Sequence, residues 1–316
     1  MMMKKKAIII SIKGKSLSYK EKLLLSKEKP WGLILFKRNI SSKIQINNLI
    51  KDIKKNVGEK YFPILIDEEG AKVSRLREIF KYNIDANYFG NLYKINSKIA
   101  ILLYKNYLKS LCTKLNKLGI NINTIPVLDV LRKNTNNIIG TRSFSYKKEI
   151  VKKLGEITIK ECHSRNILTV VKHIPGHGCT NVDSHLKMPK VTISESDLNK
   201  IDFYPFKSTK SKLAMTAHIL YTKIDSKNIS TFSNKIIKKI IRKKIGYKGI
   251  LMSDDISMKA LKHDLVTNAK MALSAGCNLV LYCEGNIKDN YKLIKSMPYI
   301  DKFTSKKTSE IFKIMR

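Results

Sequence analysis

The chain has 316 residues, of which 43% are hydrophobic, and a formal net charge of +37 at pH 7. This apolar content excludes a disordered chain and allows a sizeable core to be buried. No apolar run approaches the ~18 residues that a membrane span needs. The charge comes mainly from lysines spread along the whole chain, and aromatic residues are not interleaved with them. We therefore expect a solvated basic surface that could attract anionic substrates, with no specific nucleic-acid site.

The first residues, MMMKKKAIIISIK, imitate a signal peptide with a basic start and an apolar stretch. The apolar stretch ends at Lys13 after only six residues, below the roughly 7–15 of a signal peptide, and no small-residue cleavage site follows. We interpret it as a first buried strand. The five cysteines form no CxxC pair. Their odd number favours reduced thiols and a cytoplasmic protein.

Eight short apolar segments rich in β-formers recur along the chain. They are continuous rather than alternating, as strands covered on both faces should be. The segments are AIIISI (7–12), WGLILF (31–36), FPILID (62–67), ININTI (120–125), ILTVVKH (167–173), LAMTAHI (213–219), GILMSDD (249–255) and NLVLYC (278–283).

Stretches of helical periodicity lie between these segments, as at 42–57, 98–115 and 234–246. Strand alternating with helix indicates parallel βα units. Eight units without a Gly/Pro/Ser-rich linker predict one α/β domain over 1–316, a single (β/α)8 barrel of the TIM type. We expect the last segment, 286–316, to close the ring of helices.

Polar residues fall at or just past the ends of these predicted strands. In a barrel of this kind the catalytic residues come from the carboxyl ends of several strands. A buried structural role is reasonable for any one of them, but seven in parallel indicate a site. These residues are Asp67, Asp129, His173, His218, Asp254, Asp255 and Glu284.

The stretch KHIPGHGCTNVDSHLKMP (172–189) follows the fifth strand and is rich in histidine and glycine. A zinc site of His173, His177 and His185 with Asp183 is one hypothesis. Their spacing matches no known zinc pattern, and we predict no metal. A long loop with glycine hinges favours a mobile catalytic flap at 174–189.

Within this stretch, Asp183 and His185 stand two residues apart. A carboxylate beside an imidazole holds its tautomer and raises its proton affinity, which makes a general acid near neutral pH. We expect His177 and Cys179 to pack within the loop.

A second centre is GILMSDDISMKAL (249–261), with adjacent aspartates at a strand end. Neighbouring carboxylates repel, and in an extended chain their side chains diverge, so only one can face the barrel mouth. The structural interpretation of Asp255 is a helix N-cap, with Ser257 in the turn beyond it. Asp254 then faces the pocket.

Two further stretches supply candidate binding residues. In LIDEEGAKVSRLR (65–77), Asp67 could accept hydrogen bonds from sugar hydroxyls. Arg75 and Arg77 could reach the pocket or pair with nearby glutamates. In IIGTRSFS (138–145), Arg142 follows a glycine turn in a chain poor in arginine.

Together these motifs resemble family 3 glycoside hydrolases, specifically the single-domain bacterial β-N-acetylglucosaminidases of peptidoglycan recycling. The resemblance runs from about residue 30 to 285, with the motifs in family order. The stretch KHIPGHGCTNVDSH is similar to the family's highly specific flap motif. The other matching stretches are IDEEGAKVSRL, INTIPVLDV, IIGTRSF, MTAHILYTKID and SDDISM.

The resemblance implies a role for each matching residue. Asp254 is the implied nucleophile of a retaining double displacement, and His185 is the acid/base, polarised by Asp183. Met258 lines the pocket near the acetamido group. The implied residues that hold the terminal N-acetylglucosamine are Asp67, Arg75, Arg142, Lys172 and His173. No cofactor is implied.

Three positions depart from the family pattern: Ala71 replaces a glycine, Lys72 an arginine and Asn278 an aspartate. They are supporting positions and suggest relaxed tuning rather than loss of activity. Two alternatives remain open, a phosphorylase acting on the same glycosides and an inactive GlcNAc-binding protein. The resemblance implies muropeptide substrates, and we expect a monomer with no membrane span.

Overall fold

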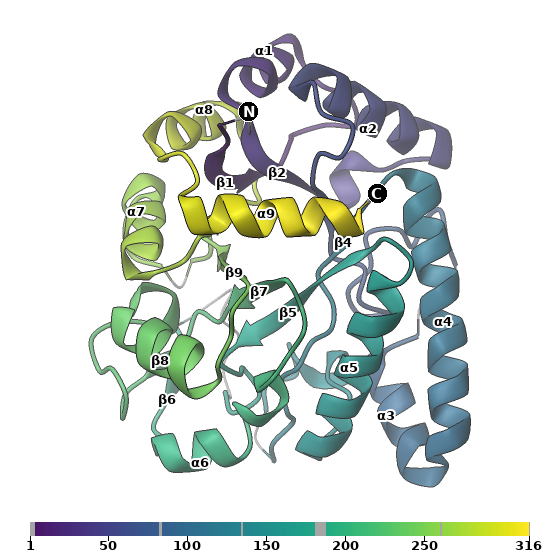
Figure 1. The fold of residues 1–316 in the computed structure, drawn as a ribbon, viewed down its shortest axis with the longest axis vertical. Coiled ribbons are helices and arrows are strands. Elements are labelled where there is room, and N and C mark those ends of the chain that lie inside the picture. Colours follow the sequence, from purple (N-terminus) through teal and green to yellow (C-terminus); the bar gives the residue numbers. More distant parts are fainter. Residues whose placement is uncertain (1–3, 82–83, 134, 181–187, 260, 316) are drawn as a thin grey trace.

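The computed structural model describes residues 4–81, 84–133, 135–180, 188–259 and 261–315. Eight parallel strands close into a barrel in which each strand pairs with its neighbours in chain order (Figure 1). The predicted (β/α)8 barrel is confirmed, and each of the eight predicted segments overlaps one of its strands. They are β1 (Lys6–Ile10), β2 (Pro30–Leu35), β3 (Ile64–Ile66), β4 (Ile122–Asn123), β5 (Leu168–Ile174), β7 (Leu213–Thr216), β9 (Ile250–Asp255) and β10 (Leu279–Leu281).

Two short strands outside the barrel, β6 (Lys190–Val191) and β8 (Leu220–Tyr221), pair in parallel and were not predicted. The helices of the described residues surround the barrel (Figure 1). They are α1 (Tyr19–Glu28), α2 (Lys43–Val57), α3 (Ala86–Ile95), α4 (Ser97–Leu118), α5 (Lys148–His163), α6 (Glu195–Lys200), α7 (Leu265–Ala275), α8 (Ile287–Ser296) and α9 (Lys302–Ile314), the π-helix η5 (Ile236–Lys244), and the 3-10 turns η1 (Lys37–Asn39), η2 (Gly140–Arg142), η3 (Tyr204–Phe206) and η4 (Ser230–Phe232).

Local sequence sets the helix ends. The Ser42 hydroxyl accepts a hydrogen bond from a backbone N–H in the first turn of α2. The helix stops at Gly58, whose φ of 76° lies in the left-handed region that glycine adopts without steric penalty. The apolar side chains between these caps recur at helical spacing and face the barrel, which is why the predicted helix at 42–57 forms.

The core has two layers, and this explains the continuous apolar strands. One set of strand side chains, including Ile9, Trp31 and Met252, fills the barrel interior. The alternate set, including Ile8, Ile66 and Leu251, packs outward against the helices. Both faces of each strand are therefore buried, as in other parallel barrels.

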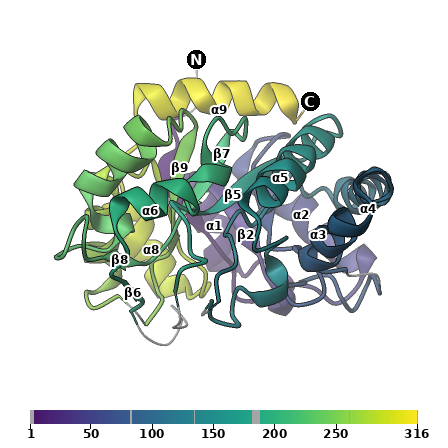
Figure 2. The ribbon, with the colours of Figure 1, turned by 90° about the horizontal axis from the view of Figure 1, so that it is seen from below.

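Helix α9 lies across the amino end of the barrel rather than in the ring of helices (Figure 2). Its Ile311 and Met315 join the cluster inside the barrel, and the Trp31 indole Nε1 donates to Thr308 Oγ1 at 2.8 Å. The expectation that all of 286–316 closes the ring is therefore correct for α8 and wrong for α9. The apolar residues at the amino end of the barrel interior give Ile311 of α9 a surface against which it is buried.

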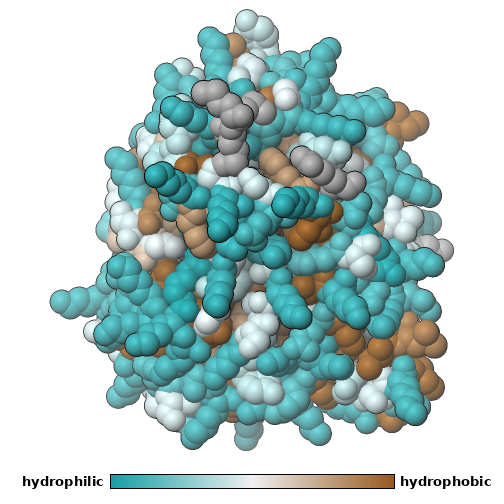
Figure 3. All heavy atoms as spheres, in the orientation of Figure 1, coloured by the Kyte–Doolittle hydropathy of each residue, from teal (hydrophilic) through white to brown (hydrophobic). Residues whose placement is uncertain are grey.

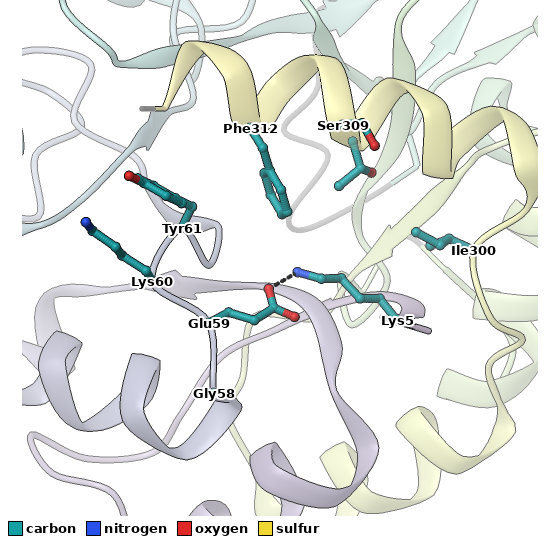
Figure 4. Close-up of a pocket in the computed structure, with 9 residues that line it drawn as sticks. Lys5, Gly58, Glu59, Lys60, Tyr61, Ile300, Ser309 and Phe312 are labelled. Carbon is teal, nitrogen blue, oxygen red and sulfur yellow. Dashed lines mark hydrogen bonds and ion pairs between the residues drawn. The ribbon is translucent and has the colours of Figure 1, made fainter. Parts of the chain in front are cut away.

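A pocket of about 260 Å³ lies beside α9 at this amino end. Figure 4 shows Phe312 on one side of it and the ion pair between Lys5 and Glu59 below, with Lys5 Nζ 2.5 Å from Glu59 Oε2. Burial lowers the pKa of Lys5 although Glu59 opposes that shift. The strand ends that carry the predicted catalytic residues lie at the opposite end of the barrel. No helix among the described residues is long and apolar enough to cross a membrane.

Candidate active site

The candidate site lies at the carboxyl end of the barrel, where polar side chains follow β3, β5 and β9. Asp67 comes directly after β3. Its carboxylate is 3.0 Å from Arg75 Nη2 and 3.3 Å from Lys172 Nζ. The Thr124 hydroxyl donates to the same carboxylate. Burial alone would raise the pKa of Asp67, but Lys172 and Arg75 outweigh it and hold the pKa well below its ordinary value.

A second carboxylate, Glu69, continues this network. It accepts two hydrogen bonds from the Arg142 guanidinium, at 2.7 and 2.9 Å, and lies 2.6 Å from Lys172 Nζ. Burial opposes ionisation, but Arg142 and Lys172 lower the pKa of Glu69 to about 2. Lys172 therefore bridges Asp67 and Glu69, and four of the predicted binding residues share one ionic network: Asp67, Arg75, Arg142 and Lys172.

The two arginines of this stretch have different partners, and Arg75 follows the first of the two alternatives that the sequence left open. Arg75 pairs with Asp67 instead of a glutamate, and Arg77 donates to the carbonyl of Ala71. Glu69, one of the glutamates that the sequence offered only as a partner of these arginines, has a buried side chain in the site. The alternation of strand side chains was the available signal, since Glu69 stands two residues after Asp67.

His173, at the end of β5, is held by Asp129. The His173 Nδ1 lies 2.7 Å from Asp129 Oδ2, and the backbone N–H groups of His173 and His177 donate to Asp129 Oδ1 at 3.2 and 2.6 Å. The Asp129 side chain is fully buried. Burial opposes its ionisation, but the charge of His173 lowers the pKa of Asp129. Asp129 thus ties the end of β5 to the first turn beyond it.

His177 is packed in the loop, as predicted. It is 3% exposed, and its ring Nδ1 lies 2.9 Å from the Thr180 hydroxyl. Burial and the charge of neighbouring His173 lower the pKa of His177 to about 4, so it is neutral near pH 7. Cys179 beside it is half-buried.

The two adjacent aspartates of β9 have different surroundings. Asp255 accepts hydrogen bonds from the backbone N–H of Ser257 at 3.0 Å and of Cys283 at 3.2 Å. Burial raises its pKa. Asp255 therefore caps a turn, whereas the next helix, α7, begins later with Asp264 as its N-cap. The Asp254 carboxylate is half-buried, and its Oδ1 accepts from the backbone N–H of Asp255 at 2.8 Å.

Cys283, just past β10, links the aspartate of β9 to the ionic network. Burial raises the pKa of its thiol well above the ordinary value, and the charges of Asp255, Asp67 and Asp254 act on it in the same direction. Asp254 and Asp67 therefore both lie close enough to this thiol, at the carboxyl end of the barrel, for their charges to act on it. His218, beneath them, lies with Nε2 3.0 Å from the carbonyl of Asp255.

The remaining candidates divide into three groups. Met258 is buried just beyond β9, at 6% exposure. Glu284 is exposed at the rim. Asp183 and His185 lie outside the described residues, as does most of the second half of the predicted flap. Among the described residues no cluster of His, Cys, Asp or Glu has the geometry of a metal site.

The three departures fit their surroundings. Ala71 is absent from the described non-glycine residues that have positive φ, so it needs no glycine. The Lys72 side chain donates to the carbonyl of Asn137. The Asn278 amide oxygen accepts from Arg242 at 2.8 Å and from the backbone N–H of Leu251 at 2.9 Å. An aspartate's acceptor role is therefore kept by the amide.

The comparisons with known proteins agree with this geometry. Residues 3–307 match the model of the glycosyl hydrolase family 3 N terminal domain. The chain belongs to glycosyl hydrolase family 3. It is 33% identical to the beta-hexosaminidase of Haemophilus influenzae, over 93% of this chain and 85% of that protein. It is 35% identical to the beta-hexosaminidase of Haemophilus ducreyi, over 87% of this chain and 80% of that protein.

Among solved structures, the family 3 chain resembles NagZ from Neisseria gonorrhoeae in complex with N-trifluoroacetyl-D-glucosamine. The TM-score is 0.89 at 28% identity, and the match covers 100% of this chain and 91% of that one. The predicted family is confirmed. The predicted class of enzyme agrees with the names of these relatives.

Proposed function

We propose that this family 3 enzyme is a retaining β-N-acetylglucosaminidase that removes a terminal non-reducing β-linked N-acetylglucosamine. The observation that carries the proposal is that Asp254, at the end of β9, and Asp67, directly after β3, lie at the same end of the barrel, where the charges of both act on the Cys283 thiol. A nucleophilic carboxylate and a hydroxyl-binding carboxylate must act on the same sugar. The names of the relatives and the aminosugar derivative bound by NagZ support the choice of sugar.

The reaction proceeds in two displacements. Asp254 attacks the anomeric carbon as the bond to the leaving oxygen breaks, and His185 donates a proton to that oxygen. Water then attacks the anomeric carbon, His185 takes its proton, and the Asp254 carboxylate is released. The Asp255 N–H, bonded to Asp254 Oδ1, fixes the orientation of the nucleophile. Asp183 holds the tautomer of His185.

The terminal sugar is held by charges that are already ordered. Asp67 stays ionised because Lys172 and Arg75 flank it, so it accepts from sugar hydroxyls at any ordinary pH. The bond to Asp129 turns the other ring nitrogen of His173, Nε2, away from that carboxylate and toward the sugar. Arg142 contributes by donating to Glu69 and holding that carboxylate in place. Met258 supplies an apolar wall for the acetamido methyl group.

The proposed natural substrates are peptidoglycan-derived muropeptides, and the proposed location is the cytoplasm. A basic surface suits substrates that carry peptide carboxylates. The five cysteines are unbridged, and Cys112 Sγ lies 3.6 Å from Cys162 Sγ, beyond the length of a disulfide. A reducing compartment keeps such a buried pair as thiols.

Trapping the covalent intermediate with a fluorinated GlcNAc donor tests the assignment. The labelled peptide contains both β9 aspartates, so fragmentation between them must locate the sugar. We expect the label on Asp254, and a label on Asp255 or elsewhere contradicts the proposal. Product analysis in phosphate buffer must give free GlcNAc, since GlcNAc-1-phosphate as the main product identifies a phosphorylase. Binding of GlcNAc with no turnover identifies an inactive sugar-binding protein.

A further inference from the structure

Exposed aliphatic side chains gather where α3 meets α4. Ile95, at the end of α3, is 83% exposed, and three residues in the first two turns of α4 continue the surface: Ile99, Leu102 and Leu103, at 49%, 60% and 43% exposure. Tyr88 of α3 is 54% exposed. We call these five residues the α3–α4 patch. An outward helix face is normally polar, and clustered exposed apolar side chains mark interaction sites.

The residues of the α3–α4 patch are not the ones with which α4 packs against the core. The opposite face of α4 already buries its own apolar stripe, with Ala100, Tyr104 and Leu108 at most 5% exposed. Figure 1 shows α4 along the edge of the molecule with α3 beside its amino-terminal end, and Figure 3 shows hydrophobic surface in that same lower right region. The patch therefore lies on a projecting corner of the molecule rather than in a groove.

The charged residues of the two helices that carry the α3–α4 patch are all basic. Residues 86–118, which span both helices, contain six lysines and no aspartate or glutamate. Lys94 and Lys98 are exposed between the aliphatic residues of the patch, and Lys109 is exposed farther along α4. Aliphatic side chains that project between lysines resemble the surface of an interfacial membrane helix.

We propose that the α3–α4 patch docks this protein on an anionic lipid surface. The aliphatic tips enter the boundary between headgroups and acyl chains, while the lysines pair with lipid phosphates. A second copy of the chain fits less well, because a two-fold contact would bring the same lysines together. A projecting corner also suits a deformable bilayer better than a rigid groove. The inference is independent of the proposed hydrolysis.

Sedimentation with lipid vesicles tests the proposal. We expect the full chain to bind vesicles of phosphatidylglycerol and phosphatidylcholine in equal amounts, and to bind pure phosphatidylcholine weakly. Binding should weaken in raised salt, because lysine attraction is screened. The double substitution K94Q/K98Q should lower the partition coefficient about 30-fold, at roughly 1 kcal/mol per lysine near the surface. The substitution I99S/L102S should lower it about tenfold or more, since each buried methylene contributes ~0.8 kcal/mol.

Helix α2 supplies a matched control. Its Ile44 is 76% exposed, the one large hydrophobic residue of α2 that is exposed, and Lys51 is exposed on the same helix. The variant I44S/K51Q should bind vesicles like the unmodified chain. Circular dichroism and thermal unfolding must show that each variant is folded. These measurements do not depend on catalytic activity, so loss of the proposed function would leave the test intact.

Three outcomes overturn the proposal. The first is absence of binding to the anionic vesicles. The second is equal loss of binding in I44S/K51Q and in the patch variants, which means that net charge alone is responsible. The third is a self-association that I99S/L102S abolishes while vesicle binding is unchanged, which makes the patch a contact between copies. Selective loss in the patch variants supports it.

Discussion

The two ends of the barrel handle buried charge in opposite ways. At the carboxyl end, Asp67 and Glu69 share Lys172, and each has an arginine as well. At the amino end the buried pair of Lys5 and Glu59 lies among apolar side chains, and burial lowers the pKa of Lys5. One end keeps its charges ionised and ordered, whereas the other closes the core.

This difference teaches where activity and stability reside. Charges held by several partners stay fixed in position, which suits a site that must bind hydroxyls without reorganising. The apolar residues that close the amino end contribute buried surface to stability and take no part in catalysis. Substitutions at the carboxyl end should therefore act mainly on catalysis, and substitutions at the amino end mainly on unfolding.

The largest expected effect is the loss of turnover in Asp254→Asn. Removing the proposed nucleophile should lower kcat by on the order of 10⁴-fold or more. The thermal unfolding midpoint should stay close to that of the unmodified protein, because Asp254 is half-buried at the barrel mouth. Steady-state kinetics with a chromogenic GlcNAc glycoside measure the effect.

Asp255→Asn is the matched control for that substitution. The amide oxygen can still accept from the backbone N–H groups of Ser257 and Cys283, so the turn should persist. We expect activity within about tenfold of the unmodified protein, since only a hydrogen bond changes. If Asp255→Asn were the inactive variant and Asp254→Asn the active one, the two roles would have to be exchanged.

At the amino end, Ile311→Ala should give the opposite result. Ile311 is fully buried where α9 meets the barrel interior, so its truncation leaves a cavity. We expect the free energy of unfolding to fall by about 2–5 kcal/mol. At temperatures where the variant is folded, kcat should not change. A large loss of kcat in the folded variant would show that the two ends are coupled.

The ionic network at the carboxyl end should also make the free energy of unfolding depend on pH. Glu69 has a pKa of about 2 in the folded protein, against an ordinary value of 4.5. Its ionised form therefore stabilises the fold above about pH 4.5, and this contribution is lost as pH falls through about 2. The depressed pKa corresponds to on the order of 3 kcal/mol.

Urea unfolding of the unmodified protein and of Glu69→Gln tests this, at pH values on either side of that window. The difference in free energy of unfolding should be largest above the window and should shrink below it. Glu78→Gln is the control, because Glu78 pairs with Lys37 at the surface. An equal pH dependence in both variants would remove the distinction between a buried network and a surface pair.

The smallest expected effect concerns Asp129→Asn. The amide oxygen can keep the two backbone hydrogen bonds, but its NH₂ group then faces His173 Nδ1 and forces the other imidazole tautomer. We expect kcat/KM to fall about 10–100-fold, mostly through KM, as for other groups that orient an imidazole. Asp202→Asn, at a buried aspartate paired with Arg132, should leave KM unchanged.

A double-mutant cycle sharpens this prediction. If Asp129 acts through the His173 ring, Asp129→Asn should have little further effect on KM once His173 has been replaced by asparagine. Additive effects of the two substitutions would instead indicate that Asp129 works only through the backbone of the loop.

Much of the fold follows from local pattern, and the exceptions are non-local. Apolar runs located all eight strands, because strands buried on both faces must be apolar throughout. Two features were missed, the pair β6–β8 and the position of α9 across the barrel. Each depends on contacts between residues far apart in sequence, as in the bond from Trp31 to Thr308.

The site was predictable as a set of residues but not as a network. Motif position identified Asp67, Lys172 and Arg142 individually. Glu69, which pairs with Lys172 and Arg142, was missed as a site residue, because in the sequence a glutamate near a turn resembles a surface residue. The role of Asp129 depends likewise on the pairing of β4 with β5.

Helix α9 also determines when the protein can finish folding. Trp31 is bonded to a residue 277 positions later in the chain. At 5–20 residues per second, a ribosome needs roughly 15 to 55 s to make the intervening segment. During that interval the interior side chains of β1 and β2 lack the cover that α9 provides. We therefore expect nascent chains to expose Trp31 and its neighbours to the cell's chaperones. The hydrogen bond of Trp31 can therefore form only after residue 308 has been made.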